Sequence, residues 1–224
     1  MKRKVDVKSR NELSASISGL YVIIDPEFTG GRDVLVVARA VLEGGAKVIQ
    51  FRDKINDKRD MNTVSESLKE LCDEYRALLF VNDYADVARS SGAHGLHVGQ
   101  NDISVEAARK ILSDEQLLGR SNGSLQEITE SRVQGADYVA VGAIFSTSTM
   151  GKSNRLSLGT EILRLAKDKI NLPVVAIGGI NKKNIRDVVN TGVDAICVVS
   201  AVTLSDDPEV STRELVDIIN HGYS

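Results

Sequence analysis

Eight short apolar runs, rich in β-branched residues, recur along the chain. Each has the length of a buried strand, and most are almost continuously hydrophobic rather than alternating. A strand that is covered on both faces has this composition, so the runs predict the strands of a parallel sheet. The runs are residues 19–25, 47–53, 78–83, 95–99, 117–122, 138–144, 173–179 and 195–201.

Segments with helical periodicity separate these runs. The segment 61–77 is amphipathic, and the segment 33–45 ends in two glycines, which is typical of a helix C-terminus. Ser104 is expected to cap the N-terminus of a helix over 104–112. The other helices are predicted over 84–91, 124–136, 160–170, 181–192 and 208–220.

A strand followed by a helix, eight times over, predicts an α/β fold that closes into a single (β/α)8 TIM barrel. An open doubly wound sheet is the alternative, but eight regular units in 224 residues favour closure. No linker or change in composition divides the chain. We therefore expect one barrel domain over residues 19–224, preceded by a polar N-terminal extension over residues 1–18.

Composition narrows the functional class. The net charge is −3, from 28 basic and 31 acidic residues, which gives no electrostatic support for binding nucleic acid or an anionic membrane. No apolar run approaches the roughly 20 residues that span a bilayer. The basic N-terminus is not followed by the apolar segment of a signal peptide, and Cys72 and Cys197 have no metal-type spacing. We expect a soluble cytoplasmic protein with two buried thiols.

The second predicted strand carries an unusual polar face. Gln50, Arg52 and Lys54 occupy alternate positions, so their side chains point to the same side. A buried cation is costly unless it has a partner. The partner is either an internal carboxylate, such as Asp25 or Asp83, or a bound anion.

Two carboxylates follow the next two strands. Asn82 and Asp83 end the third strand, and Asp102 lies just beyond the fourth. In a TIM barrel the C-terminal strand ends form the active site, so these carboxylates would be neighbours there. Mg²⁺ accepts such a pair because it takes its other ligands from water and substrate phosphates. The alternative for each is a helix N-cap.

The last strands carry the features of a phosphate site. Gly178 and Gly179 end the seventh strand, and the loops after strands seven and eight bind phosphate in many TIM barrels. The loop 145–154 is rich in hydroxyl groups and contains Lys152. A phosphate cradle on one side of the mouth and cations with a carboxylate pair on the other suggest an enzyme that joins two phosphorylated substrates.

Taken together, these motifs resemble those of the thiamine-phosphate synthase family, in order and over about residues 19–208. They are Q-x-R-x-K at Gln50 to Lys54, N-D at Asn82-Asp83, G-Q-x-D at Gly99 to Asp102, G-x-S at Gly119 to Ser121, T-x-T at Thr147 to Thr149, G-G-I at Gly178 to Ile180, and Val199-Ser200.

The resemblance implies a transferase of thiamine biosynthesis. An aminopyrimidine diphosphate and a hydroxyethylthiazole phosphate would be condensed to thiamine phosphate, with release of diphosphate. The family pattern assigns the pyrimidine diphosphate to Gln50, Arg52, Lys54, Asn82 and Ser121. It assigns Mg²⁺, as the cofactor, to Asp83 and Asp102, and the thiazole phosphate to Thr147, Ser148, Thr149, Gly178, Gly179, Val199 and Ser200. Arg52, Lys54, Ser121 and Lys152 would carry catalysis. No protein nucleophile is required, the partners are these small molecules, and homo-oligomer formation is left open.

The chain departs from the family pattern at two positions. Met150 stands where the family has a lysine directly after T-x-T, and Lys152 follows two residues later. Gly123 replaces a histidine that relatives carry beside the pyrimidine site. The alternatives are therefore a thiazole tautomerase-like isomerase, a non-catalytic thiazole or thiamine phosphate-binding protein, and another phosphate-binding barrel enzyme. The tautomerase is disfavoured because it is expected to use that histidine and to lack the carboxylate pair.

Overall fold

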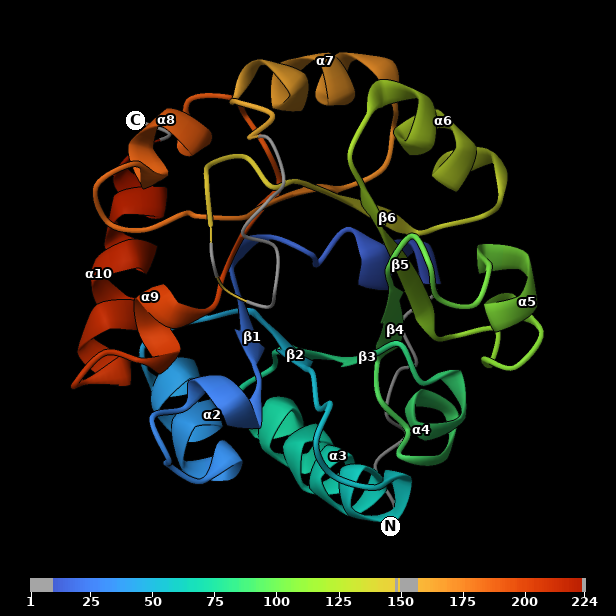
Figure 1. The fold of residues 1–224 in the computed structure, drawn as a ribbon, viewed down its shortest axis with the longest axis vertical. Coiled ribbons are helices and arrows are strands. Elements are labelled where there is room, and N and C mark those ends of the chain that lie inside the picture. The colour runs from blue at the N-terminus through green and yellow to red at the C-terminus, as the bar shows by residue number, and fades with distance from the viewer. Residues whose placement is uncertain (1–9, 148, 150–156, 223–224) are drawn as a thin grey trace, which may run out of the picture.

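Eight parallel strands form a closed barrel in this computed structural model, which describes residues 10–147, 149 and 157–222. Each strand pairs with the next, and β8 pairs with β1 (Figure 1). The predicted TIM barrel is confirmed. The strands are β1 (Gly19–Ile24), β2 (Val48–Phe51), β3 (Leu78–Asn82), β4 (Gly95–Val98), β5 (Leu117–Asn122), β6 (Tyr138–Val141), β7 (Val174–Ile177) and β8 (Ala195–Val198).

Helices surround the barrel in Figure 1, which looks along its axis. In the described ranges no helix is long and apolar enough to cross a membrane. The helices are α1 (Arg10–Ser14), the 3-10 turn η1 (Pro26–Phe28), α2 (Val34–Glu43), α3 (Lys58–Glu74), α4 (Ala85–Ser90), α5 (Val105–Arg109), α6 (Leu125–Val133), α7 (Glu161–Lys169), α8 (Ile185–Val189), α9 (Ser200–Thr203) and α10 (Pro208–His221).

Two element boundaries differ from those that the hydrophobic pattern predicts. Helix α3 starts three residues before the predicted segment because the Asp57 side chain accepts from the backbone N–H groups of Arg59 and Asp60. The eighth apolar run was predicted as strand up to residue 201, but β8 ends at Val198 and Ser200 begins the short helix α9. The change matters because it puts Ser200 at a turn in the barrel mouth.

Two apolar layers stabilise the barrel. One lies between the strands and the helices and includes Val22 and Ile24 of β1. The other fills the barrel interior, where the rings of Tyr21 and Phe80 stack at 6.0 Å and Phe80 meets Tyr138 edge-on at 5.1 Å. The alternation along β1 is hidden in the sequence because both of its faces are apolar.

The N-terminal segment covers the end of the barrel opposite the mouth. Helix α1 lies beside β5, and Ile17, which follows it, is 1 % exposed. The Ser14 hydroxyl donates to the Asp137 carbonyl at 2.9 Å, and Arg10 pairs with the Asp137 carboxylate at 3.0 Å. Residues 10–18 of the predicted extension therefore pack against the barrel.

Candidate active site

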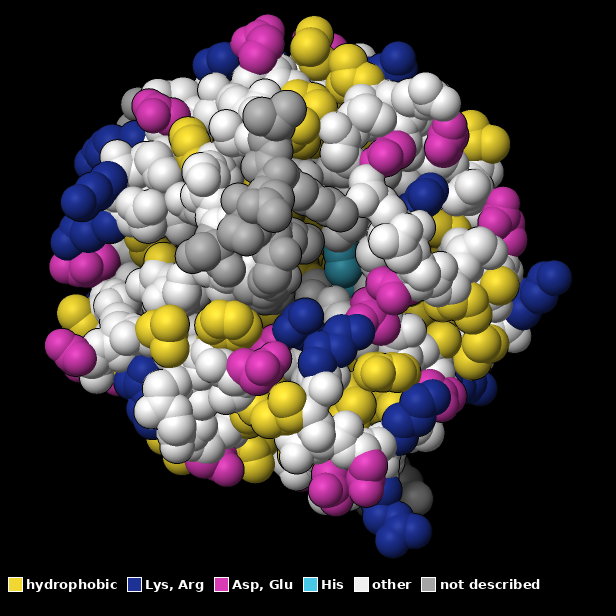
Figure 2. Space-filling view, in the orientation of Figure 1, with side chains coloured by type: hydrophobic (Ala, Val, Ile, Leu, Met, Phe, Trp, Pro, Cys, Tyr) yellow, Lys and Arg dark blue, Asp and Glu magenta, His cyan; other side chains and the backbone are white. Residues whose placement is uncertain are grey.

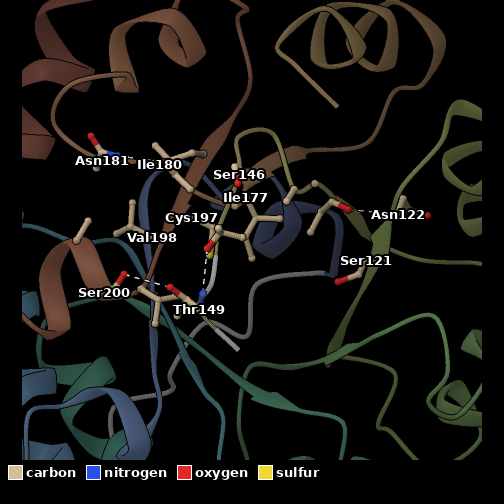
Figure 3. Close-up of a pocket in the computed structure, with 18 residues that line it drawn as sticks. Ser121, Asn122, Ser146, Thr149, Ile177, Ile180, Asn181, Cys197, Val198 and Ser200 are labelled. Carbon is tan, nitrogen blue, oxygen red and sulfur yellow. Dashed lines mark hydrogen bonds between the residues drawn. The ribbon is translucent and has the colours of Figure 1, made fainter. Parts of the chain in front are cut away.

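A cavity of about 350 Å³ opens at the C-terminal ends of β5 to β8. Figure 3 shows Ser121 and Asn122 on one side of it and Ser200, Val198 and Asn181 on the other. The predicted thiazole-phosphate residues that the structure describes all line this cavity: Thr147, Thr149, Gly178, Gly179, Val199 and Ser200. Ser148 and Lys152 lie outside the described residues.

The two glycines after β7 form a turn that other residues cannot adopt easily. Gly178 has φ +105° and Gly179 has φ +67°. A Cβ on Gly178 would lie 2.5 Å from the Ala143 Cβ, and one on Gly179 would lie 2.5 Å from the Ser146 carbonyl oxygen. At both positions a larger residue would be strained by the positive φ and would also clash with its neighbours. The backbone of this turn forms part of the cavity wall.

Hydrogen bonds fix this turn and the hydroxyl groups that face it. The Gly179 carbonyl accepts from the side-chain amides of Asn181 and Asn184 at 3.1 and 3.0 Å. Across the cavity, the Thr149 and Ser200 hydroxyls lie 3.3 Å apart (Figure 3). The described lining residues thus offer hydroxyl and backbone groups to a small anion, and none of these described residues has a charged side chain.

The charged half of the mouth lies beside this cavity, not within its lining. Side chains of both signs gather at the centre of the face in Figure 2, over the ends of β2 and β3. Arg52 is ion-paired with Asp25, whose side chain is fully buried, and Lys54 is ion-paired with Asp83. Each of the two cations thus has an internal partner, and both partners are the carboxylates that the sequence offered as alternatives to a bound anion.

Asp83 and Asp102 lie close enough to interact. Burial, followed by the hydrogen bond and negative charge of Asp102, raises the pKa of Asp83 above its ordinary value, although Lys54 acts in the opposite direction. Burial lowers the pKa of Lys54, but its hydrogen bond and ion pair with Asp83 outweigh this, and the net pKa is raised. The site therefore holds more negative charge than Lys54 alone compensates.

Neither carboxylate is a helix cap, which was the alternative for each. Ser104 caps α5 as predicted, by accepting from the Ala107 N–H, and no side chain caps α4 after Asp83. Asp102 instead accepts from the Gly99 N–H at 2.7 Å, and Asp83 adopts φ +65°, an uncommon conformation for a non-glycine residue. Within the described residues no group of three or more potential metal ligands occurs. Two adjacent carboxylates still fit Mg²⁺, which needs few protein ligands.

The structure also places a histidine and two tyrosines next to the predicted site. Tyr21, Tyr138 and His97 form a buried hydrogen-bonded chain that ends on Gln50 and Ser121. Sequence reasoning missed these three residues, because each lies in an apolar run where an aromatic side chain indicates core. A polar atom at the end of an aromatic ring was the only available signal.

Gly123, where relatives carry a histidine, lies beside a different polar group. Its backbone N–H donates to the Glu127 carboxylate at 2.6 Å, and the Gln100 amide donates to the same carboxylate. A Cβ on Gly123 would be in ordinary contact with both side chains, at 3.5 and 3.7 Å. The space at this position is thus bordered by an amide and a carboxylate.

Comparisons with known proteins agree on one family. Residues 20–202 match the family described as thiamine monophosphate synthase. A thiamine-phosphate synthase of Clostridium novyi (strain NT) is 39 % identical over 89 % of this chain and 97 % of its own length. One of Moorella thermoacetica is 38 % identical over 91 % and 96 %. A solved thiamine phosphate pyrophosphorylase from Pyrococcus furiosus superposes with a TM-score of 0.85 and 39 % identity, over 96 % of this chain and 99 % of that one.

The fold, the order of the strand-end motifs and these matches lead to one conclusion. The chain belongs to the thiamine monophosphate synthase family.

Proposed function

We propose that this protein is a thiamine-phosphate synthase. It condenses an aminopyrimidine diphosphate with a hydroxyethylthiazole phosphate, and it releases thiamine phosphate and diphosphate. The observation that carries the proposal is the division of the barrel mouth into two regions of different chemistry. One is the hydroxyl- and glycine-lined cavity, and the other is the group of Arg52, Lys54, Asp83 and Asp102.

The reaction requires positioning and charge neutralisation. The thiazole nitrogen forms a bond to the pyrimidine methylene carbon, while the bond from that carbon to the diphosphate oxygen breaks. Arg52 and Lys54 bind the departing diphosphate and neutralise its developing charge. Gln50, Asn82 and Ser121 hold the pyrimidine, and the cavity residues hold the thiazole phosphate, so the two reacting atoms are kept adjacent.

Asp83 and Asp102 are the residues that would hold Mg²⁺. When bound, the ion would act as a Lewis acid on the leaving diphosphate and complete its coordination with phosphate and water oxygens. Two observations support this assignment: the two carboxylates interact directly, and neither caps a helix.

The loop after β6 carries the remaining assignment. Lys152 is proposed to replace the family lysine at the position of Met150, and both residues lie outside the described ranges. Ser148, in the same loop, stays a predicted thiazole-phosphate contact. Met150, which removes a charged contact that would assist the leaving group, is the feature behind the alternative of a binding protein without activity, and the relatives named thiamine-phosphate synthase do not favour this alternative.

The test is an assay of thiamine phosphate formation from the two substrates, with Mg²⁺ and with EDTA. Metal-dependent product supports the synthase and its metal site. Product that forms equally well in EDTA would remove the metal assignment. Failure to form product, with thiazole phosphate binding intact in calorimetry, would favour the binding protein. The cytoplasmic location and homo-oligomer formation remain predictions.

A further inference from the structure

A chain of hydrogen bonds crosses the barrel interior beneath the mouth. The Gln50 amide nitrogen lies 2.6 Å from the Tyr21 hydroxyl, which is 3.0 Å from the Tyr138 hydroxyl. The Tyr138 hydroxyl lies 2.8 Å from His97 Nδ1, and His97 Nε2 lies 2.9 Å from the Ser121 hydroxyl. The hydrogen-bonded chain ends at Gln50 and at Ser121, and both residues are predicted to bind the pyrimidine substrate.

The strand register makes this chain possible. Gly119 on β5 is paired with His97 on β4 and with Tyr138 on β6. A Cβ on Gly119 would lie 2.0 Å from the Tyr138 ring, so the ring occupies the space that any other residue at this position would fill. Gly119 therefore lets Tyr138 reach across one strand to His97, which gives a physical reason for the glycine in the G-x-S motif.

The number of hydrogens gives the chain a direction. Tyr21 and Tyr138 are at most 1 % exposed, and burial raises the pKa of both, so each hydroxyl keeps its hydrogen at neutral pH. The Tyr21 oxygen accepts a hydrogen bond from the Gln50 amide. Among the described contacts of the Tyr21 hydroxyl, Tyr138 is then the acceptor for the hydrogen of Tyr21. The Tyr138 hydrogen then goes to His97 Nδ1, because the other described partner of this hydroxyl, Tyr21, is already its donor.

The direction determines the state of the last two groups. A neutral histidine that accepts at Nδ1 carries its hydrogen on Nε2. His97 then donates to the Ser121 oxygen, and the Ser121 hydrogen is left for another acceptor. Ser121 lines the cavity, so that acceptor would be a ligand. In the opposite direction Ser121 would donate to His97, and the buried Tyr21 hydrogen would need the Gln50 side-chain oxygen as its acceptor, where the structure has the Gln50 amide nitrogen.

We propose that Tyr21, Tyr138 and His97 are positioning residues that fix the Ser121 hydroxyl as a hydrogen-bond donor to a ring nitrogen of the pyrimidine substrate. Pyrimidine ring nitrogens accept hydrogen bonds, so a serine held as donor distinguishes them from a ring edge that donates. The identity of the ligand rests on the proposed function, whereas the direction of the chain does not.

The first experiment reads the His97 tautomer directly. NMR of protein containing ¹⁵N-histidine, without substrate and at neutral pH, distinguishes a protonated from an unprotonated ring nitrogen, and His97→Gln and His221→Gln spectra assign the signals. His94 is an internal reference: burial lowers its pKa to about 4, and its Nδ1 accepts from the Leu79 N–H at 3.0 Å. We expect His97 to carry its hydrogen on Nε2, as His94 does. A hydrogen on His97 Nδ1 would overturn the proposal.

The second experiment measures kinetics of Tyr138→Phe, which removes the donor to His97 and keeps the ring. The KM for the pyrimidine diphosphate should rise about 3- to 10-fold, the effect of one hydrogen bond, and the KM for the thiazole phosphate should not change. Tyr75→Phe is the matched control, because it removes an exposed hydroxyl that bonds Glu43 at 3.2 Å. Equal changes in both KM values would indicate a merely structural role for Tyr138.

A double variant tests whether Tyr138 acts through Ser121. Tyr138→Phe combined with Ser121→Ala should be no worse than Ser121→Ala alone. Full additivity of the two losses contradicts the proposal. A wild-type protein that makes no thiamine phosphate overturns the proposed function only, because the tautomer is measured without substrate.

Discussion

The two halves of the barrel mouth differ in how polar and charged side chains are arranged. The half at β7 and β8 is an open cavity whose wall is made of glycine backbone and hydroxyl groups. The half at β2 to β4 holds two ion pairs, Arg52 with Asp25 and Lys54 with Asp83, and the further carboxylate of Asp102. The described lining of the first half carries no charged side chain, whereas each cation of the second half would have to leave its carboxylate, or share it, to bind an anion.

The difference suggests how charge is kept in a buried site before substrate arrives. Asp25 is fully buried and Arg52 is largely so, and an unpaired charge at either position would be costly. The internal ion pairs compensate the charges of Arg52 and Lys54 while no substrate is bound. Four experiments test this difference between the two halves, and the expected effects decrease from the first to the last.

Asp83→Ala should have the largest effect. The change removes a proposed Mg²⁺ ligand and the partner of Lys54, so turnover should fall by about 100-fold or more while thiazole phosphate binding persists. Steady-state kinetics and calorimetry measure the two effects. Asp86→Ala is the matched control: this nearby carboxylate has an exposed pair with Lys58 at 2.7 Å, and its removal should leave activity unchanged. Full activity of Asp83→Ala would remove the metal assignment.

Arg52→Ala should weaken the pyrimidine diphosphate by roughly 10- to 150-fold, the range for a charged hydrogen bond, and the thiazole phosphate far less. The change also leaves Asp25 buried without its cation, so the free energy of unfolding should decrease. The double variant Asp25→Asn/Arg52→Ala separates the two effects. It should regain stability in urea unfolding without regaining affinity. Equal loss of affinity for both substrates would contradict the division of the mouth.

Gly179→Ala should damage the cavity half specifically. The new methyl group would meet the Ser146 carbonyl oxygen at 2.5 Å in a backbone conformation with φ +67°. Gly192→Ala is the matched control, since Gly192 has φ +75° with nothing within 4 Å of a Cβ. The control should cost about 1–2 kcal/mol for the left-handed conformation. Gly179→Ala should cost about 1–3 kcal/mol more for overpacking and should lose thiazole phosphate binding. Equal stability and intact binding would argue against the cradle.

The smallest effect concerns the titration of Asp83. Its raised pKa means that the folded protein holds the proton more tightly than the unfolded chain does. The contribution of this group to stability is therefore present below its ordinary pKa of about 3.8 and is lost as the pH rises through the raised value. Carboxyl ¹³C NMR should show that the pKa of Asp83 is lower in the Asp102→Asn variant than in the wild type, and that it also falls when Mg²⁺ is added. An unchanged titration in both cases would show that the two carboxylates do not share a site.

Much of this architecture was accessible from the sequence because it rests on local rules. All eight strands lie within the predicted apolar runs, and Ser104 caps its helix as expected. The carboxylates that pair with Arg52 and Lys54 were among the predicted alternatives, because a buried cation requires a nearby anion. Residues 200–201 were misassigned to a strand because hydrophobicity does not mark where β8 gives way to a short helix.

Three features could be predicted from the amino-acid sequence alone: the barrel, the strand ends that carry polar groups and the family to which the chain is similar. Periodicity and short motifs specify these features, since they reflect burial and backbone conformation within a few residues. Two other features became visible in the folded structure: the carboxylate with which each cation pairs, and the contact of Tyr138 with His97 over Gly119. These contacts depend on barrel closure and strand register, and a shift of one residue would turn every one of these side chains to the other face of the sheet.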